Sequence, residues 1–404
     1  MAFGAFARPD AVSQAGLRRV LVTLCVTEIT SWGALYYAFP VLAGDITAAT
    51  GWPTAAITAA LSASQLVAAL VGIPVGRWLD HHGPRGVMTA GSLLAVPALV
   101  AVATAQNLAW FLGAWLLVGM AMGAVLYPPA FAALTRWHGP GRVRALTMLT
   151  LAAGLASTVF APLTAALAAH LDWRATYLVL AGILALVTIP GHWFGLVLPW
   201  PERPKAEAGY EHAHPGKVAR SPAFVTLAIA LSLAAFATFA VVINLVPLLA
   251  ERGIGTGIAS VALGLGGAGQ VLGRLGYTTL TRRTTVRART ALILLAMAVT
   301  TALLGVLTSA AALIGAAILA GMARGVFTLL QATAVTDRWG PRYYGQLSGL
   351  LSAPLTVAMA LAPFAGAALA GPLGGYATTF LVLSTVTAAA AVLSLATNPE
   401  RNLS

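Results

Sequence analysis

Charged residues, lysine and cysteine are all scarce in this chain. Only 8% of its 404 residues are charged, against about 25% in soluble domains, so a globular protein with a water-facing surface is excluded. Cysteine occurs once, as Cys25, and no intramolecular disulfide can form. Hydrophobic residues make up 59% of the chain. This balance predicts a multi-pass protein of the cell (inner) membrane, in contact with the lipid bilayer.

Several chemical signatures are also missing. The sequence has no Gly-Lys-Ser/Thr loop to cradle a phosphate, no clustered metal ligands and no paired nucleophile and base. We therefore expect no ATP-driven pump, no metal, no cofactor and no catalytic residues. The net charge of +12 would suit nucleic acid, but the basic residues form short clusters between apolar runs rather than one polar face. No nucleic-acid partner is expected.

Twelve apolar runs follow one another along the chain, each about as long as the 20 residues that a bilayer crossing needs. The runs cover 19–43, 54–77, 87–105, 109–134, 145–169, 174–198, 222–250, 257–280, 289–307, 311–336, 344–370 and 375–397. They predict an all-α membrane protein with twelve transmembrane helices. The first run is longer than the apolar core of a signal peptide, so no cleavage is expected.

The basic residues give these predicted helices a sidedness. If the runs cross alternately, every Lys and Arg outside them or at their ends falls on one side, except Arg174 and Arg252. Cytoplasmic loops carry the excess of Lys and Arg. Both termini lie on the basic side and are expected to be cytoplasmic.

The two halves of the chain resemble each other. Gly119-Met120-Ala121-Met122-Gly123 recurs 202 residues later as Gly321-Met322-Ala323-Arg324-Gly325, and Arg136-Trp137 recurs at the same offset as Arg338-Trp339. We predict an N-terminal six-helix bundle over 1–198, a cytoplasmic central loop over 199–221 and a C-terminal six-helix bundle over 222–404. Such a repeat is typical of secondary transporters that hold substrate between the halves. A monomer is expected.

Only three formal charges lie inside the apolar runs, away from the first and last residue of each run: Glu28, Arg274 and Arg324. A charge near the bilayer centre costs about 2.5 to 3.5 kcal/mol on insertion scales, and such residues commonly serve a function. Glu28, about 14 Å into its helix at 1.5 Å per residue, could couple transport to a proton or merely neutralise an arginine. Trp32 and Tyr36 follow on the same helical face, as a cavity wall or as ordinary packing.

Arg324 begins a polar stripe that continues with Thr328 and Gln331 on one helical face. Its planar guanidinium suits a carboxylate or phosphate, so we predict an anchor for an anionic substrate; an ion pair with Glu28 is the alternative. Asn244 and Tyr127 are lesser substrate-binding candidates, since polar side chains also bond helices to each other. A further polar residue, His192, is expected at the membrane interface.

The loop after the second run reads Gly76-Arg77-Trp78-Leu79-Asp80-His81-His82-Gly83-Pro84-Arg85. It is similar to the signature G-x-x-x-D-R-x-G-R-R of the major facilitator superfamily, matching at Gly76, Asp80, Gly83 and Arg85 and departing at His81 and Pro84. The resemblance covers nearly the whole chain. It implies a gating role for the four matching residues, with Asp80 latching the two halves when the cytoplasmic side is closed.

Within that superfamily the eighth run resembles the monocarboxylate transporter and oxalate/formate exchanger branch, in which the eighth helix carries a substrate-binding arginine. Arg274 occupies that place here, with Gln270 where the animal monocarboxylate transporters have an aspartate. The resemblance implies substrate contact at both positions and moves proton coupling to Glu28. The alternative for Arg274 is that it extends to the cytoplasmic face.

The predicted function is therefore secondary active transport of a small, monocarboxylate-like organic anion by alternating access, coupled to protons as symport or antiport. Two cations against one acid favour an anionic substrate, because a cationic one would leave the arginines uncompensated. The alternative is a proton-driven multidrug or metabolite efflux transporter. Against it, Ala161-Pro162-Leu163-Thr164-Ala165-Ala166 has alanines where the drug/proton antiporter motif G-P-x-x-G-G has glycines.

Overall fold

The computed structural model describes residues 13–201 and 215–397, and within these ranges the secondary structure is entirely helical. The elements are α1 (Gln14–Trp32), the π-helical turn η1 (Gly33–Tyr37), α2 (Ala38–Thr50), α3 (Thr54–His82), α4 (Pro84–Ala103), α5 (Leu108–Val125), α6 (Tyr127–His138), the 3-10 turn η2 (Gly139–Gly141), α7 (Arg142–Ala153), α8 (Ala156–Ala168), α9 (Trp173–Pro190), the π-helical turn η3 (Gly191–Gly195), α10 (Pro215–Ala219), α11 (Pro222–Glu251), α12 (Thr256–Arg283), α13 (Val286–Val306), α14 (Ala310–Thr333), α15 (Thr336–Trp339), α16 (Tyr344–Ala370) and α17 (Tyr376–Ser394).

Each predicted apolar run coincides with one or more of these helices. Within the described residues, ten helical segments are long and apolar enough to cross a membrane. One of them, Leu108–Ala168, has 61 residues and is interrupted by the extended residue Leu126 and by η2. At 1.5 Å per residue this is too long for a single crossing of a core about 30 Å thick. It contains two of the predicted runs.

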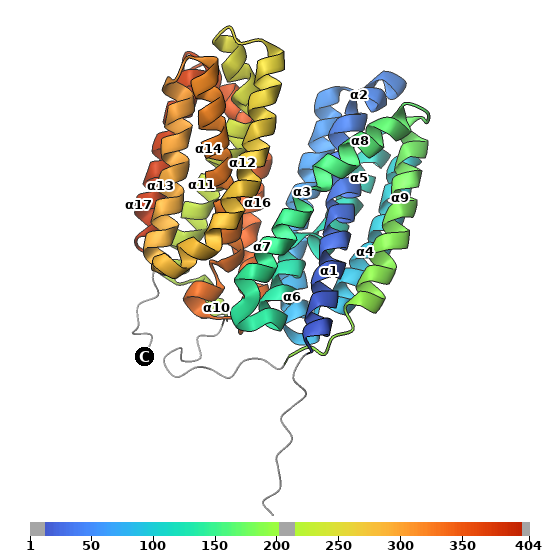
Figure 1. Cartoon of the computed structure of the whole chain (residues 1–404). Helices are drawn as coiled ribbons and strands as arrows, with labels where there is room; N and C mark the ends of the chain where they lie inside the picture. The colour runs from blue at the N-terminus through green and yellow to red at the C-terminus, as the bar shows by residue number, and fades with distance from the viewer. Residues whose placement is uncertain (1–12, 202–214, 398–404) are drawn as a thin grey trace, which may run out of the picture.

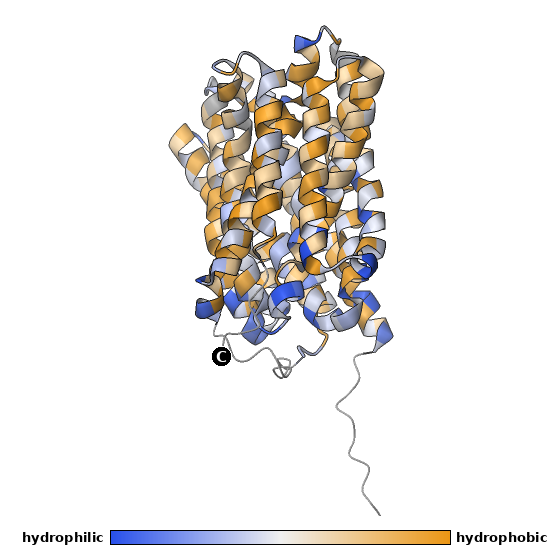
Figure 2. Cartoon of the chain, turned by 90° about the vertical axis from the view of Figure 1, so that its left-hand side faces the viewer, coloured by the Kyte–Doolittle hydropathy of each residue, from blue (hydrophilic) through white to orange (hydrophobic). Residues whose placement is uncertain are grey.

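The helices gather in two groups, one from each half of the chain (Figure 1). Helices α1 to α9 form one group and α11 to α17 the other, and α16 of the second group packs against α3 and α6 of the first. Hydrophilic residues collect at the end where the two groups approach each other (Figure 2). We call this the arginine-rich end; its arginines include Arg77, Arg85, Arg136, Arg142, Arg289 and Arg338.

Close contacts between helices recur in the two halves at the same offset as the sequence repeat. A Cβ on Gly119 would lie 2.2 Å from the Ser64 carbonyl oxygen, and one on Gly321 would lie 1.9 Å from the Gly266 carbonyl oxygen. Ser64 lies 202 residues before Gly266, the same offset that separates the two glycines. Small residues allow membrane helices to approach this closely. The pairs α3–α5 and α12–α14 therefore pack in equivalent ways.

Arg174 and Arg252, at the end opposite the arginine-rich end, bind equivalent backbone carbonyls in the two halves. Arg174 donates to the carbonyl of Ala103 at 2.7 Å, at the C-terminus of α4, and Arg252 donates to the carbonyl of Gly305 near the C-terminus of α13. Ala103 and Gly305 are themselves 202 residues apart. Cations stabilise helix C-termini, whose carbonyls lack partners. These two arginines, which lie away from the predicted cytoplasmic side, thus stabilise helix C-termini.

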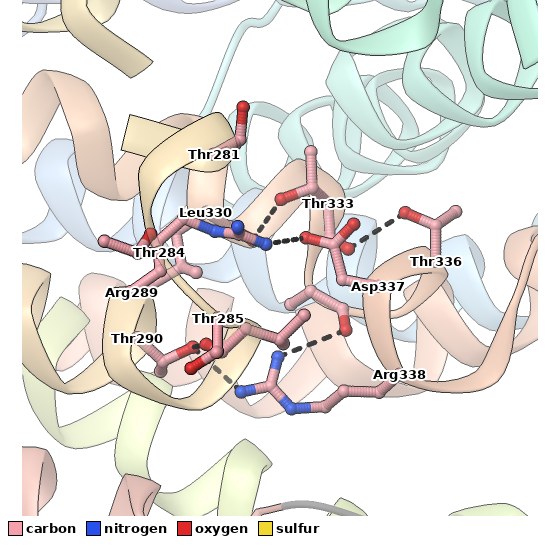
Figure 3. A network of polar contacts seen from close by, with 12 residues as sticks. Thr281, Thr284, Thr285, Arg289, Thr290, Leu330, Thr333, Thr336, Asp337 and Arg338 are labelled. Atoms are coloured by element: carbon pink, nitrogen blue, oxygen red, sulfur yellow. Dashed lines mark hydrogen bonds and ion pairs between the residues drawn. The ribbon is translucent and has the colours of Figure 1, made fainter. Parts of the chain in front are cut away.

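A polar network fixes the arginine-rich end of the second half (Figure 3). Asp337 pairs with Arg289 of α13 and, at 3.2 Å, with Arg142 of α7 in the first half. Arg338 is 2% exposed and donates to Thr290 and to Thr397. Burial lowers the pKa of Arg338 to about 10, so it stays charged at neutral pH and needs these acceptors. Asp337 connects the two halves.

Candidate functional site

Glu28 is completely buried in α1. Its carboxylate oxygens have no hydrogen-bond partner among the described residues, and both ion pairs found in those residues belong to Asp337. The side chain of Trp32, one turn later, lies close enough to interact with the carboxylate, although not in hydrogen-bonding geometry. The alternative of an ion pair between Glu28 and Arg324 is therefore wrong for this conformation.

The π-helical turn η1 follows Trp32 and changes the direction of the next side chains. It packs closely on α8, since a Cβ on Gly33 would lie 2.1 Å from the ring of Phe160. The wider turn lets the consecutive residues Tyr36 and Tyr37 both reach Trp32, with ring centroids 5.5 and 6.3 Å from it. π-helical turns inside α-helices are frequent at functional sites. Here the turn brings two tyrosines to one place.

Tyr127 completes an aromatic cluster in the first half. It is the first residue of α6, directly after the extended Leu126, and its ring lies 5.1 Å from Trp32 and 4.9 Å from Phe131. We call Trp32, Tyr36, Tyr37, Tyr127 and Phe131 the aromatic wall. The first four of these are partly exposed, so the wall is accessible rather than sealed in a core.

The two intramembrane arginines of the second half lie within electrostatic range of this wall. The charges of Arg274 and Arg324 both act on Tyr37, and that of Arg274 also acts on Tyr127. The two arginines are within range of each other as well. The charge of Glu28 reaches Tyr127 in turn. The structure thus gathers the three charges predicted from the sequence around one set of tyrosines.

Arg324 is partly exposed and lines a small pocket within the second half, between α11, α12, α13 and α14. Its neighbours there include Gly266 and Gly321, where the two helices approach closely. The first-half counterpart of Arg324 is Met122, which is 1% exposed and contacts Ser64. At this repeated position the first half packs the Met122 side chain in its interior, whereas the second half has space for the Arg324 guanidinium.

Arg274 is 4% exposed and does not extend to the arginine-rich end, so that alternative is wrong. Its Nη1 donates to the carbonyl of Thr150 in α7. Gln270 lies one turn earlier on α12, partly exposed, and Gln331 is partly exposed on α14. Asn244 is buried in the second half, where its amide donates to Ala240 at 2.8 Å. No hydrogen bond in the described residues joins Asn244 to the arginines.

The predicted gating residues lie at the arginine-rich end. Asp80 is 5% exposed and its carboxylate accepts the backbone N–H groups of Gly345, at 2.9 Å, and Gln346, at 2.8 Å. These are the second and third residues of α16, so Asp80 acts as an N-cap supplied by the other half. A Cβ on Gly76 would lie 2.1 Å from the Gly345 carbonyl oxygen. Both residues hold α3 against α16.

Gly83 and Arg85 contact the first half instead. Gly83 has φ +78, a left-handed conformation that favours glycine, and packs on Trp200. The Arg85 Nε donates to the Trp193 carbonyl at 2.9 Å and its guanidinium lies 4.3 Å from that ring. These two fix the turn between α3 and α4, just after Asp80, rather than touching α16.

Sequence reasoning missed four features. Tyr37 is adjacent to Tyr36, but an ordinary α-helix would point it elsewhere. The Thr150 carbonyl is a backbone group without a sequence signal. Asp337 precedes the repeated Arg338 and was not singled out. His192 is fully buried, with Nδ1 2.8 Å from Ser92 Oγ, a contact that the sequence does not indicate.

Comparison with known proteins places this arrangement among transporters. A model of the Major Facilitator Superfamily matches residues 24–313. Monocarboxylate transporter 11 of Homo sapiens is 29% identical over 226 residues, which cover 54% of this chain and 46% of that protein. The matched region is therefore about half of that relative's length.

Two solved structures share the fold. The human organic anion transporter MFSD10 superposes with a TM-score of 0.76 at 19% identity, covering 94% of this chain and 99% of its own. The E. coli fucose:proton symporter superposes with a TM-score of 0.71 at 13% identity, covering 94% and 98%. At these identities the likeness concerns the fold alone.

Proposed function

Because the chain belongs to the Major Facilitator Superfamily, we propose that it is a secondary active transporter that carries a small, monocarboxylate-like organic anion by alternating access. The observation that carries this proposal is the placement of Arg274 and Arg324 within range of each other and of Tyr37, without an acidic partner among the described residues. A buried guanidinium needs a counter-charge. An anionic substrate supplies it, and the monocarboxylate transporter relative supports this class.

The proposal includes the membrane topology. It comprises twelve crossings, with bundles over 1–198 and 222–404 and a central loop over 199–221, and the two groups of helices in Figure 1 support a division into halves. The arginine-rich end is assigned to the cytoplasm of the cell (inner) membrane, on the charge rule. A monomer suffices, since both halves of the site come from one chain.

The present conformation is closed at the arginine-rich end by Asp80 on α16 and by the pair of Arg142 with Asp337. In this state Arg274 and Arg324 would hold the anion against the aromatic wall. Glu28 would bind and release the coupled proton, since its buried carboxylate has no cation to keep it charged. The energy comes from an ion or substrate gradient.

Uptake into proteoliposomes tests the anion site. Radiolabelled lactate, pyruvate and benzoate serve as probes, and Arg324→Gln is compared with Arg287→Gln, which removes an exposed arginine of the same half. We expect Arg324→Gln to lose at least 90% of the uptake as a rough measure, because a charged hydrogen bond contributes about 1.5 to 3 kcal/mol, while Arg287→Gln retains it. Unchanged uptake kinetics in Arg324→Gln would remove this residue from the site.

The aromatic wall favours one second candidate, proton-driven efflux of lipophilic compounds. Stacked and edge-on rings such as Tyr127 and Phe131, 4.9 Å apart, offer a face to flat apolar molecules and to cations. Substrate charge separates the two functions. Transport of hydrophobic cations that persists in Arg324→Ala would favour efflux over the organic anion.

A further inference from the structure

The fifth predicted run contains a helix break at its middle. Helix α7 ends at Ala153 and α8 begins at Ala156, with Gly154 between them. At this break the Thr150 carbonyl oxygen accepts two donors, the Gly154 N–H at 3.0 Å and Nη1 of Arg274. A single backbone oxygen of the first half therefore anchors an arginine of the second half.

Gly154 leaves the space that the guanidinium occupies. A Cβ at this position would lie 2.8 Å from Arg274 Nη1, closer than side-chain atoms normally approach. The backbone of Gly154 is right-handed helical, with φ −60 and ψ −22, so alanine fits its conformation. Only the contact with the arginine, and two carbonyl oxygens at 3.2 Å, oppose a side chain there.

The anchored guanidinium retains an unused edge. Nη1 is occupied by Thr150, whereas Nε is buried without a hydrogen-bond partner in the described part of the chain. Nε and Nη2 lie on the same side of a guanidinium and together form the fork that binds a carboxylate through two parallel hydrogen bonds. Tyr37 and Tyr127 lie within electrostatic range of this guanidinium, and a buried, unpaired donor there is a place for an acceptor.

We propose that Thr150 and Gly154 are positioning residues for the anion, holding Arg274 by Nη1 so that its Nε edge receives a carboxylate. The inference rests on the proposed function and deepens it. Because Arg274 and its anchor belong to different halves, the carboxylate site is complete only while the arginine-rich end is closed. Opening that end separates α7 from α12, removes the anchor and releases the anion.

Kinetics of uptake test the positioning role. In proteoliposomes with radiolabelled lactate, pyruvate and benzoate, Gly154→Ala should raise KM about tenfold and leave kcat within about twofold, since a displaced arginine weakens binding first. Gly182→Ala is the matched control, a helical glycine of the same half with open space around its Cβ position. In an Arg274→Gln background, Gly154→Ala should add nothing. A KM equal to that of the control, or an additive rise, would overturn the inference.

A measurement without substrate separates this inference from the proposed function. Spin labels at the exposed positions Arg144 and Arg287, in a Cys25→Ser background, report the distance between the halves at the arginine-rich end. Gly154→Ala should shift the distances toward the wider, open state, and Gly182→Ala should not. If the wild type takes up none of the probes, the anion function fails, but unchanged distances in Gly154→Ala are what would refute the anchor.

A second variant covers the case in which Gly154→Ala does not fold. Arg274→Lys keeps the positive charge but replaces the planar fork with a compact ammonium. It should raise KM about tenfold and widen the distance between the labels, because it can serve neither Thr150 nor the carboxylate in the same geometry. Wild-type values of both quantities in Arg274→Lys would contradict the positioning role.

Discussion

Removing the Asp80 carboxylate should open the arginine-rich end. The carboxylate accepts two backbone N–H groups at the start of α16, at 2.9 and 2.8 Å, and is almost fully buried. Hydrogen bonds to a charged group contribute about 1.5 to 3 kcal/mol each, and an acid at a helix N-terminus adds about 0.3 to 1 kcal/mol. All of these interactions are made across the two halves, so they stabilise only the closed state.

The net free-energy difference is smaller than the sum of these contacts, because the open state regains hydrogen bonds to water. When the halves separate, water replaces part of the lost contact, so we take about 3 kcal/mol as the net difference for Asp80→Ala. At about 1.4 kcal/mol per factor of ten, the ratio of open to closed protein should rise about 100-fold. Asp80→Asn keeps one acceptor oxygen without the charge, and should raise the ratio about tenfold.

Distances between spin labels at Arg144 and Arg287 measure that ratio, and the chain provides a close control. Glu251 accepts the backbone N–H of Tyr376 at 2.6 Å, at the start of α17, but both residues belong to the second half. Glu251→Gln removes a comparable helix-end contact without touching the interface. If Asp80→Ala gave the same distance distribution as Glu251→Gln, the reasoning that the Asp80 contacts close this end would be refuted.

Three further predictions concern the coupling acid and the packing. Glu28→Gln should abolish the pH dependence of uptake while exchange persists, whereas Asp45→Asn, which removes an exposed acid of α2, should leave the pH profile unchanged. Arg338→Ala should lower the free energy of unfolding by about 3 kcal/mol, measured by tryptophan fluorescence in detergent, because buried acceptors lose their donor. Gly321→Ala should cost about 1 to 3 kcal/mol by overpacking α12 against α14, and Gly264→Ala, with open space, close to nothing.

The positions of the helices could be predicted from the sequence because apolar length and charge decide them. The predicted run 222–250 became α11 (Pro222–Glu251), which begins where Ser221 caps the N–H of Phe224 and a proline occupies the first turn. The run 344–370 has the same bounds as α16. Such ends are set by local chemistry, which the sequence displays.

The two interruptions of predicted runs differ in what the sequence shows. The predicted runs 109–134 and 145–169 are mainly apolar, yet the chain is extended at Leu126 and breaks at Gly154. Prolines occupy the first turn of α6 directly after Leu126, and proline lacks the N–H that would continue the preceding helix, so this break has a local signal. The break at Gly154 accommodates Arg274 of the other half, a neighbour distant in sequence that the local pattern does not indicate. Both interruptions lie at the candidate site.

The repeat shows how the two halves differ in their interfaces. Arg274 lies 202 residues after Gly72, in the register that already pairs Gly266 with Ser64. Gly72 faces the other half through backbone contact, since a Cβ on Gly349 would lie 2.8 Å from its carbonyl oxygen. At the equivalent position of the interface between α12 and α7, the guanidinium of Arg274 donates to the Thr150 carbonyl. At this position the first interface offers only backbone packing, whereas the second offers a guanidinium, so an anion that enters can act directly on the second.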